Sequence, residues 1–411
     1  MGKLSPRPRS AKQSDRIFEV YDPQMPDRTL ILQMIADELR HRRQKGMDQL
    51  KQLCEEQLAV RYRVEDRPRV NQRLSQELQT IQTNGQADAF EEARSKVQVL
   101  SEQGFGCRMI GAGCSSLVSY LMNLSEVDPI EHGLPYERFL TTNSTGMIQF
   151  TFVADWQTDM SGKVFSPIQD GLFSDAVRIH PSTALESIPG LVAKVIRETK
   201  PDFHLSAIPW NDEATFETLR SGNVDGVNQF ERVEGQRTLL DLKPRSLLDI
   251  AITTALKAVQ FRDAHENGTL EEYVRRGVPK AHKTPENWLV TETLQDTRGM
   301  MLFQEQIMLI LNRVADIPLA DAYDFIKAVC KRQMEPVAAI RVLFVIGATE
   351  NGVNEADAQS IFEKIRDAAT WAVCKSHHLS GAITTYHAAF LKTHFPTEFS
   401  KVLQIIQTMR F

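Results

Sequence analysis

Apolar residues recur every three to four positions along most of the chain, the spacing of helices with one buried face. The first such segment begins near residue 29, with Leu30, Ile31, Met34, Ile35 and Leu39. Helical patterns cover about residues 29–60, 70–103, 115–123, 185–199, 214–220, 246–262, 301–313, 319–330, 335–350, 355–370 and 380–408. The pattern predicts a mainly helical protein.

Three short apolar runs, at about residues 107–110, 147–153 and 176–180, predict strands of a small mixed sheet, so the expected class is α+β. We divide the chain into a disordered basic tail (1–28), a sheet-containing domain with N-terminal helices (29–205) and a helical domain (206–411). The tail assignment rests on its Pro, Arg, Ser and Lys content.

Length and composition favour an ordinary globular protein. The chain has 411 residues, 42% of them hydrophobic and 25% charged, which is enough for two or three domains. It contains no apolar run of membrane-spanning length, and its first residues lack a signal core, so we expect no membrane contact. Five cysteines without a CxxC pair favour the cytoplasm and argue against zinc.

The net charge of −5 restricts any nucleic-acid affinity to local patches. One candidate patch is Arg40, His41, Arg42, Arg43 and Lys45, near the end of a helical pattern. The alternative is a solvated helix end whose cations complement the helix dipole.

Residues 204–231 follow an order that neither a helix nor a strand period requires, including Ile-Pro-Trp-Asn-Asp at 208–212 and Gly-Asn-Val-Asp-Gly-Val-Asn-Gln-Phe-Glu at 222–231. The stretch resembles the alpha subunit of bacterial DNA polymerase III, a C-family polymerase. Collinear blocks extend the resemblance to roughly residues 45–400: 120–140, 242–244, 299–308 and 375–399. The resemblance implies a palm-like domain over 29–205 and a fingers-like domain over 206–411.

The same resemblance marks what we expect to be missing. Only residues 154–174 separate the two palm segments, which leaves no room for the family's thumb. The family's N-terminal phosphoesterase-like domain has no counterpart either. Where the family has Met-Pro-Asp-Ile-Asp-Ile-Asp-Phe, this chain has Gln149, Thr151 and Val153 at the aspartate positions, and His180 at the third acidic ligand.

Polymerase chemistry needs two magnesium ions about 3.5–4 Å apart, and Gln, Thr and Val cannot hold them. We therefore expect no catalytic residues, no metal and no cofactor. The alternative is that Asp155, Asp159 and His180 rebuild a magnesium site, which would make the chain a minimal DNA polymerase or nucleotidyltransferase. A spacing of four residues suits a helix or loop better than neighbouring ligands on a strand.

Three segments resemble the family's nucleotide and DNA contacts. The first is a glycine-rich loop that cradles phosphates in the family, with Gly111, Gly113, Ser115 and Ser116 retained; Ile110 and Ala112 replace its Arg and Ser, so a structural turn is the alternative. The second contains Lys327, Lys331 and Arg332, which we expect to meet a triphosphate unless they form a solvated helix face. The third contains Lys375, Ser376 and His377, expected to anchor the fingers or contact a phosphate.

These observations predict a catalytically inactive relative of the alpha subunit in the bacterial cytoplasm, with association with the nucleoid also open. Its expected role is as a DNA-binding or scaffolding element of replication or repair, bound to DNA through local basic patches and to a protein partner. The remaining alternative is a pure protein-interaction scaffold without nucleic-acid binding.

Overall fold

The computed structural model describes residues 28–141, 148–155, 157–158, 164–165, 174–262, 269–277 and 287–408. For residues 28–36 and 38–43 it describes the backbone only. The expected tail, Met147 and Asp159 therefore lie outside the described residues, except that Arg28 begins the first helix.

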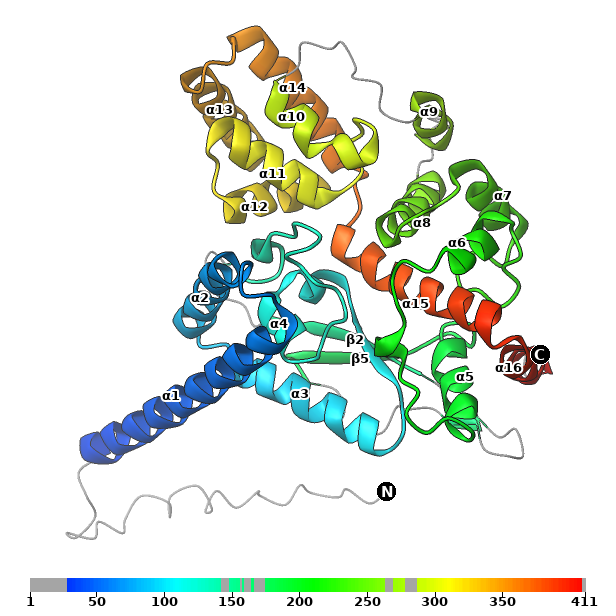
Figure 1. Ribbon diagram of the computed structural model, residues 1–411. Coiled ribbons are helices and arrows are strands. Elements are labelled where there is room, and N and C mark those ends of the chain that lie inside the picture. The colour runs from blue at the N-terminus through cyan, green and yellow to red at the C-terminus, as the bar shows by residue number, and fades with distance from the viewer. Residues whose placement is uncertain are drawn as a thin grey trace, which may run out of the picture.

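The protein is mainly helical with a small mixed sheet, which confirms the expected α+β class (Figure 1). The N-terminal and central helices are α1 (Arg28–Arg61), α2 (Arg67–Asn84), α3 (Ala87–Glu102), α4 (Leu117–Leu121), α5 (Ile188–Arg197), α6 (Glu213–Arg220), α7 (Val233–Leu242) and α8 (Leu247–Arg262). The later ones are α9 (Thr269–Arg276), α10 (Trp288–Thr293), α11 (Gln304–Ala315), α12 (Leu319–Cys330), α13 (Met334–Glu350), α14 (Glu355–Ala369), α15 (Lys375–His394) and α16 (Pro396–Thr408). The 3-10 turns are η1 (Gly111–Ser115), η2 (Tyr136–Arg138), η3 (Leu205–Ala207) and η4 (Gln295–Thr297).

The main sheet has the order β1-β2-β5, formed by β1 (Cys107–Ile110), β2 (Phe150–Ala154) and β5 (Val177–Pro181). β1 runs antiparallel to β2 and β5 runs parallel to it, so the sheet is mixed. β3 (Gln157–Thr158) and β4 (Val164–Phe165) form a separate antiparallel pair.

The alternation of β2 decides which face of the sheet is buried. Phe150 and Phe152 point into the core, where the ring of Phe150 lies 4.9 Å, centroid to centroid, from that of Phe90 on α3. Thr151 and Val153 point to the opposite face, because neighbouring side chains on a strand alternate. That opposite face carries the positions where the family resemblance places metal ligands.

Two of the expected helices are each divided in two. The pattern at 70–103 breaks at Gly85, whose φ of +64° ends α2 in a left-handed conformation suited to glycine. The pattern at 380–408 breaks between α15 and α16 at Pro396, which has no amide hydrogen to continue a helical ladder. The short helices α7, α9 and α10 are not predicted by the sequence pattern.

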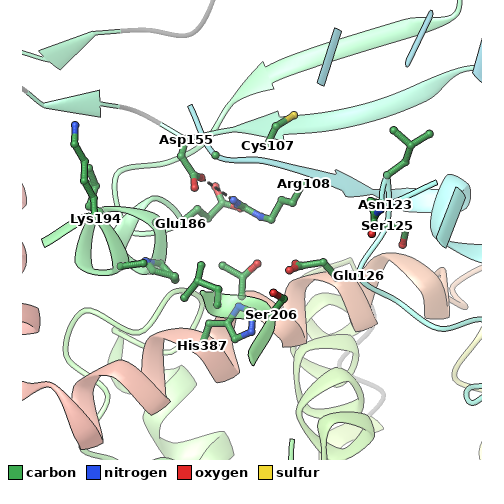
Figure 2. A pocket seen from close by; sticks show the side chains of 18 of the residues that line it. Cys107, Arg108, Asn123, Ser125, Glu126, Asp155, Glu186, Lys194, Ser206 and His387 are labelled. Carbon is green, nitrogen blue, oxygen red and sulfur yellow. Dashed lines mark hydrogen bonds and ion pairs between the residues drawn. The ribbon is translucent and has the colours of Figure 1, made fainter. Parts of the chain in front are cut away.

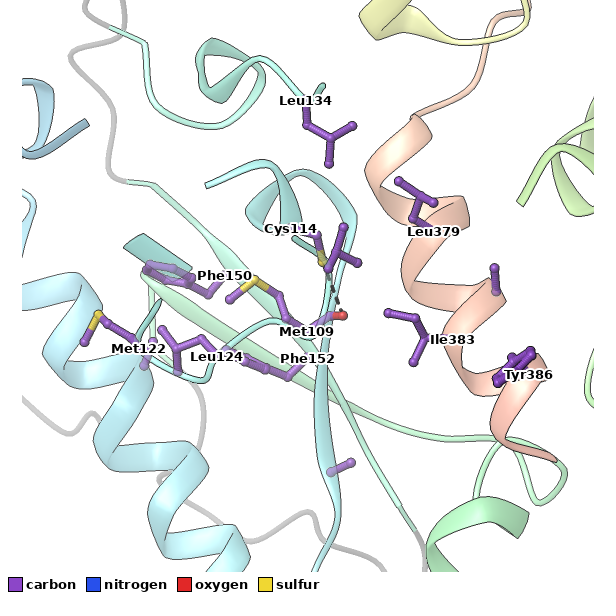
Figure 3. Packing of buried hydrophobic residues seen from close by; sticks show 14 of the residues in the cluster. Met109, Cys114, Met122, Leu124, Leu134, Phe150, Phe152, Leu379, Ile383 and Tyr386 are labelled. Carbon is purple, nitrogen blue, oxygen red and sulfur yellow. Dashed lines mark hydrogen bonds between the residues drawn. The ribbon is translucent and has the colours of Figure 1, made fainter. Parts of the chain in front are cut away.

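The buried side chains form three clusters. The largest joins α1–α5 and the sheet to α15 and α16, and a second one lies among α10–α14. α15 lies against the sheet, since Ser380 Oγ donates to the carbonyl of Met109 at 2.6 Å, and Ile383 and Tyr386 of α15 belong to the same cluster (Figure 3). A division at 205/206 remains a prediction, whereas burial groups α15 and α16 with the sheet. None of the helices, within the described residues, is long and apolar enough to cross a membrane.

Candidate functional site

The residues at the expected metal-ligand positions lie together on one face of the sheet. Thr151 pairs with Arg178, and Val153 pairs with His180 on β5. Gln149 precedes the strand, and its Nε2 donates to the carbonyl of Asp175 at 3.3 Å. Val153 is buried, with 6% of its surface exposed, whereas His180 is exposed. The face is therefore assembled, but these four positions supply no carboxylate.

Asp155, immediately after β2, is held in an internal ion pair. Its Oδ1 lies 2.8 Å from Arg108 Nη1, and Arg108 Nη2 lies 3.4 Å from Glu186 Oε1. Burial raises the pKa of Asp155 to about 6, although Arg108 acts in the opposite direction. Gly106 and Gly190 make room for the carboxylate, because a Cβ on either would lie 2.6 or 2.7 Å from Asp155 Oδ2.

This arrangement does not favour a rebuilt magnesium site around Asp155. The guanidinium of Arg108 already occupies the carboxylate, and its charge would repel a cation. Within the residues that the structure describes, no three His, Cys, Asp or Glu side chains are grouped to hold a metal ion. Asp159 lies outside those residues, so the alternative stays a prediction.

The glycine-rich segment folds as η1 and leads into α4, and an internal carboxylate occupies its amide donors. Glu77 on α2, fully buried, accepts hydrogen bonds from the amides of Leu117 and Val118 at 2.9 and 3.2 Å. It also accepts from Ser116 Oγ at 2.7 Å and pairs with Arg73 at 2.7 Å. The geometry favours the structural-turn alternative.

The segment at Lys375–His377 meets the glycine-rich segment, as Ser376 Oγ donates to the carbonyl of Gly111 at 3.0 Å. A second buried carboxylate, Glu305 on α11, accepts from the amides of Lys375 and Ser376 at 2.7 and 3.2 Å. Lys375 Nζ donates to the carbonyl of His132 at 2.9 Å, and burial lowers the pKa of this lysine. His377 is exposed. Two of the three residues are therefore engaged in joining α15 to the rest of the molecule.

The third segment is the most accessible. Lys327 on α12 pairs with Asp324 at 2.5 Å and lies 4.6 Å above the ring of Tyr323. α12 ends at Cys330, so Lys331 caps the helix and does not continue its face, and Arg332 follows with a φ of +56°. Both Lys331 and Arg332 are exposed. Among the expected phosphate contacts, these two cations remain available to a ligand.

Sequence reasoning missed a cavity of about 670 Å³ beside the end of β2 (Figure 2). Its walls come from the sheet, the loop after α4, α5, η3 and α15. Glu126 and His387 line it without having been singled out, because residues from five separate segments meet there and no local spacing connects them. The carboxylates Glu77 and Glu305 were missed for the same reason.

A small mixed sheet joined to a helical region, with the expected ligand strand at its centre, defines a protein of the polymerase palm-and-fingers class. Residues 48–151 match the family model of the bacterial DNA polymerase III alpha NTPase domain. Residues 184–352 match that of the bacterial DNA polymerase III alpha subunit finger domain. The chain belongs to the DNA polymerase III alpha family.

Curated relatives agree. The chain is 31% identical over 226 residues to DNA polymerase III subunit alpha of Deinococcus radiodurans, covering 52% of this chain and 17% of the relative. It is 32% identical over 213 residues to that of Pasteurella multocida, covering 50% and 18%. An error-prone DNA polymerase of Cutibacterium acnes matches at 23% identity, covering 84% of this chain and 40% of the relative. The chain thus spans well under half the length of these relatives.

Proposed function

We propose that this protein is a catalytically inactive relative of the polymerase III alpha subunit that binds DNA or scaffolds an assembly in replication or repair. The observation that carries the proposal is the face of β2. Thr151 and the buried Val153 stand where metal-binding carboxylates are expected, and the nearest carboxylate beyond them, Asp155, is bound to Arg108. Such a face cannot position two magnesium ions for phosphoryl transfer.

DNA contact is the favoured form of this role because Lys331 and Arg332 are exposed after α12. Phosphate contacts of this kind supply sequence-independent affinity that weakens as salt rises. Since the whole chain carries a charge of −5, the affinity depends on such local cations.

Fluorescence anisotropy of labelled primer–template, single-stranded and duplex DNA across a salt series tests the binding. We expect binding at low salt that does not require Mg²⁺. The double variant Lys331→Glu with Arg332→Glu should weaken it and reduce the salt slope by about 0.7–0.9 per lost phosphate contact. Lys401→Glu, on the exposed side of α16, is the control for a general charge effect.

Primer extension with Mg²⁺ or Mn²⁺ tests the inactivity. We expect no nucleotide incorporation. Incorporation that disappears in Asp155→Ala would establish the minimal-polymerase alternative and overturn the proposal.

A second candidate, the pure interaction scaffold, is favoured by one specific observation. α13 exposes four large apolar side chains, Met334, Val342, Leu343 and Ile346, with exposed fractions of 76%, 58%, 55% and 51%. Large apolar side chains grouped on one helix are typical of a protein interface. If the anisotropy series shows no salt-sensitive binding of any DNA, this candidate replaces the first.

A further inference from the structure

The cavity beside β2 contains polar groups that the fold leaves without partners. His387 on α15 has an exposed fraction of 3%, and its Nε2 has no hydrogen-bond partner. Buried polar atoms are nearly always bonded in folded proteins, so an unpartnered one that lines a cavity points to an unseen ligand or water. Burial lowers the pKa of His387 to about 4, so the ring is neutral near pH 7.

Glu126 is the second such group. Its side chain is exposed within the cavity, and no hydrogen bond or ion pair joins its carboxylate to another of the described residues. Burial raises its pKa more than Arg108 lowers it. In Figure 2, Glu126 and His387 both face the open space between the sheet and α15. A ligand that donates hydrogen bonds would satisfy both.

An aromatic surface lies beside these groups. Trp210 lines the cavity and stacks on His387, with ring centroids 5.2 Å apart and planes at 24°. Trp210 is 40% exposed, so part of its surface is free to contact a further planar group. Carboxylate, imidazole and indole together suit a flat heterocycle with N–H donors.

Cations occupy another part of the wall. Lys194 and Arg197, in the last turn of α5, are exposed and line the cavity. Lys194 lies on the opposite side of the opening from Glu126 in Figure 2. The cavity therefore offers donors for an anion at one side and acceptors at the other. The carboxylates Glu126 and Asp155 disfavour a simple anion, and the polar walls disfavour a lipid chain.

We propose that this cavity binds a free nucleoside phosphate, with the base against Glu126, His387 and Trp210 and the phosphate held by Lys194 and Arg197. A volume of about 670 Å³ is in the range of small-molecule sites. Guanine is the preferred base because its N1–H and exocyclic amino group present two neighbouring donors to one carboxylate. The site is separate from the β2 face and from Lys331, and it does not depend on the proposed function.

Isothermal titration calorimetry of the full chain tests the site with guanosine monophosphate, inosine monophosphate, guanosine and inorganic phosphate. Inosine monophosphate lacks only the exocyclic amino group, so we expect it to bind at least about tenfold more weakly than guanosine monophosphate. Inorganic phosphate alone should bind more weakly still. This comparison needs no variant and stands even if a substitution impairs folding.

Two variants separate the halves of the ligand. Glu126→Gln should remove most of the difference between the guanine and hypoxanthine nucleotides. Lys194→Ala with Arg197→Ala should weaken guanosine monophosphate about tenfold or more while leaving guanosine unchanged. Lys331→Ala is the control and should alter neither titration, and thermal melting confirms that each variant is folded.

Three results would overturn the proposal. One is the absence of saturable binding of guanosine monophosphate at about 5 mM, a weaker affinity than the contacts imply. Another is equal binding of the two nucleotides. The third is binding that is unaffected at Glu126 and at Lys194 with Arg197 but lost in Lys331→Ala.

Discussion

At the scale of single residues, two buried glutamates take the place of external anions. The first amides of a helix have no partner within the helix and carry a partial positive charge. Glu77 binds those of α4, and Glu305 binds those of α15, each from another helix. Positions that resemble phosphate contacts in sequence are therefore internal joints of this fold.

Replacing Glu77 with glutamine tests this role. The change preserves shape but removes the charge that pairs with Arg73, and it places an amide donor against other donors. Because breaking a buried ion pair leaves one charge unpaired, we expect a loss of about 3 kcal/mol in the free energy of unfolding, measured in urea. Glu56→Gln, at an exposed site on α1, should change it by less than about 0.5 kcal/mol. Equal effects at both sites would contradict the joint.

Two residues of the cavity should give opposite pH dependences of stability. The pKa of Asp155 is raised to about 6 from 3.8, so its contribution is present below pH 3.8 and is lost as the pH rises towards 6. The pKa of His387 is lowered to about 4 from 6.5, so its contribution is present above pH 6.5 and is lost as the pH falls towards 4. The signs follow from which state binds the proton more tightly.

We therefore expect the stability difference between the native protein and Asp155→Asn to fall between pH 4 and 6. The difference between the native protein and His387→Gln should rise over a similar interval. Each change should amount to at most about 3 kcal/mol. Chemical denaturation at a series of pH values measures both, and slopes of the same sign would show that the burial of one group is misassigned.

At the scale of elements, the contact between α11 and α13 depends on a glycine. A Cβ on Gly347 of α13 would lie 2.4 Å from the carbonyl oxygen of Ala315, the last residue of α11. We expect Gly347→Ala to lower the free energy of unfolding by about 1–3 kcal/mol, because backbone atoms cannot move aside cheaply.

Gly46→Ala is the matched control, since Gly46 lies within α1 and its nearest atom is Asp88 Oδ1 at 3.8 Å. There alanine should stabilise the protein by about 0.5–1 kcal/mol, because glycine is the weaker helix former. The two denaturation midpoints should therefore move in opposite directions, and a stabilising effect at Gly347 would show that the helices can separate.

The elements were far more predictable from sequence than the site. Spacing of apolar residues gave α12 at 319–330 and β1 at 107–110 because these segments bury one face or pack within the core. It missed α9, whose single buried residue, Tyr273, sets no period. The cavity and the Glu77 joint depend on contacts between distant segments, such as Glu77 with Val118, which no local pattern encodes.

At the scale of the whole molecule, two cations link the sheet-containing part to the helices α11–α15. Arg138 of η2 donates to Tyr323 Oη at 2.6 Å and to Gln304 Oε1 at 2.9 Å, and its guanidinium lies 4.5 Å from the centre of the Tyr323 ring. Lys375 makes the other link through the carbonyl of His132. A planar guanidinium can bond two partners and stack at once, which an ammonium group cannot.

Arg138→Lys should therefore loosen the helical part without unfolding the sheet. We expect faster amide hydrogen exchange in α11 and α12, with the exchange of β1 and β2 unchanged, since local opening follows the loss of contacts that hold a unit in place. Arg366→Lys, whose ion pairs with Glu363 and Asp367 lie at the surface of α14, is the control and should leave exchange unchanged. Faster exchange throughout the molecule would mean that Arg138 stabilises a single cooperative unit, and the link between two parts would have to be abandoned.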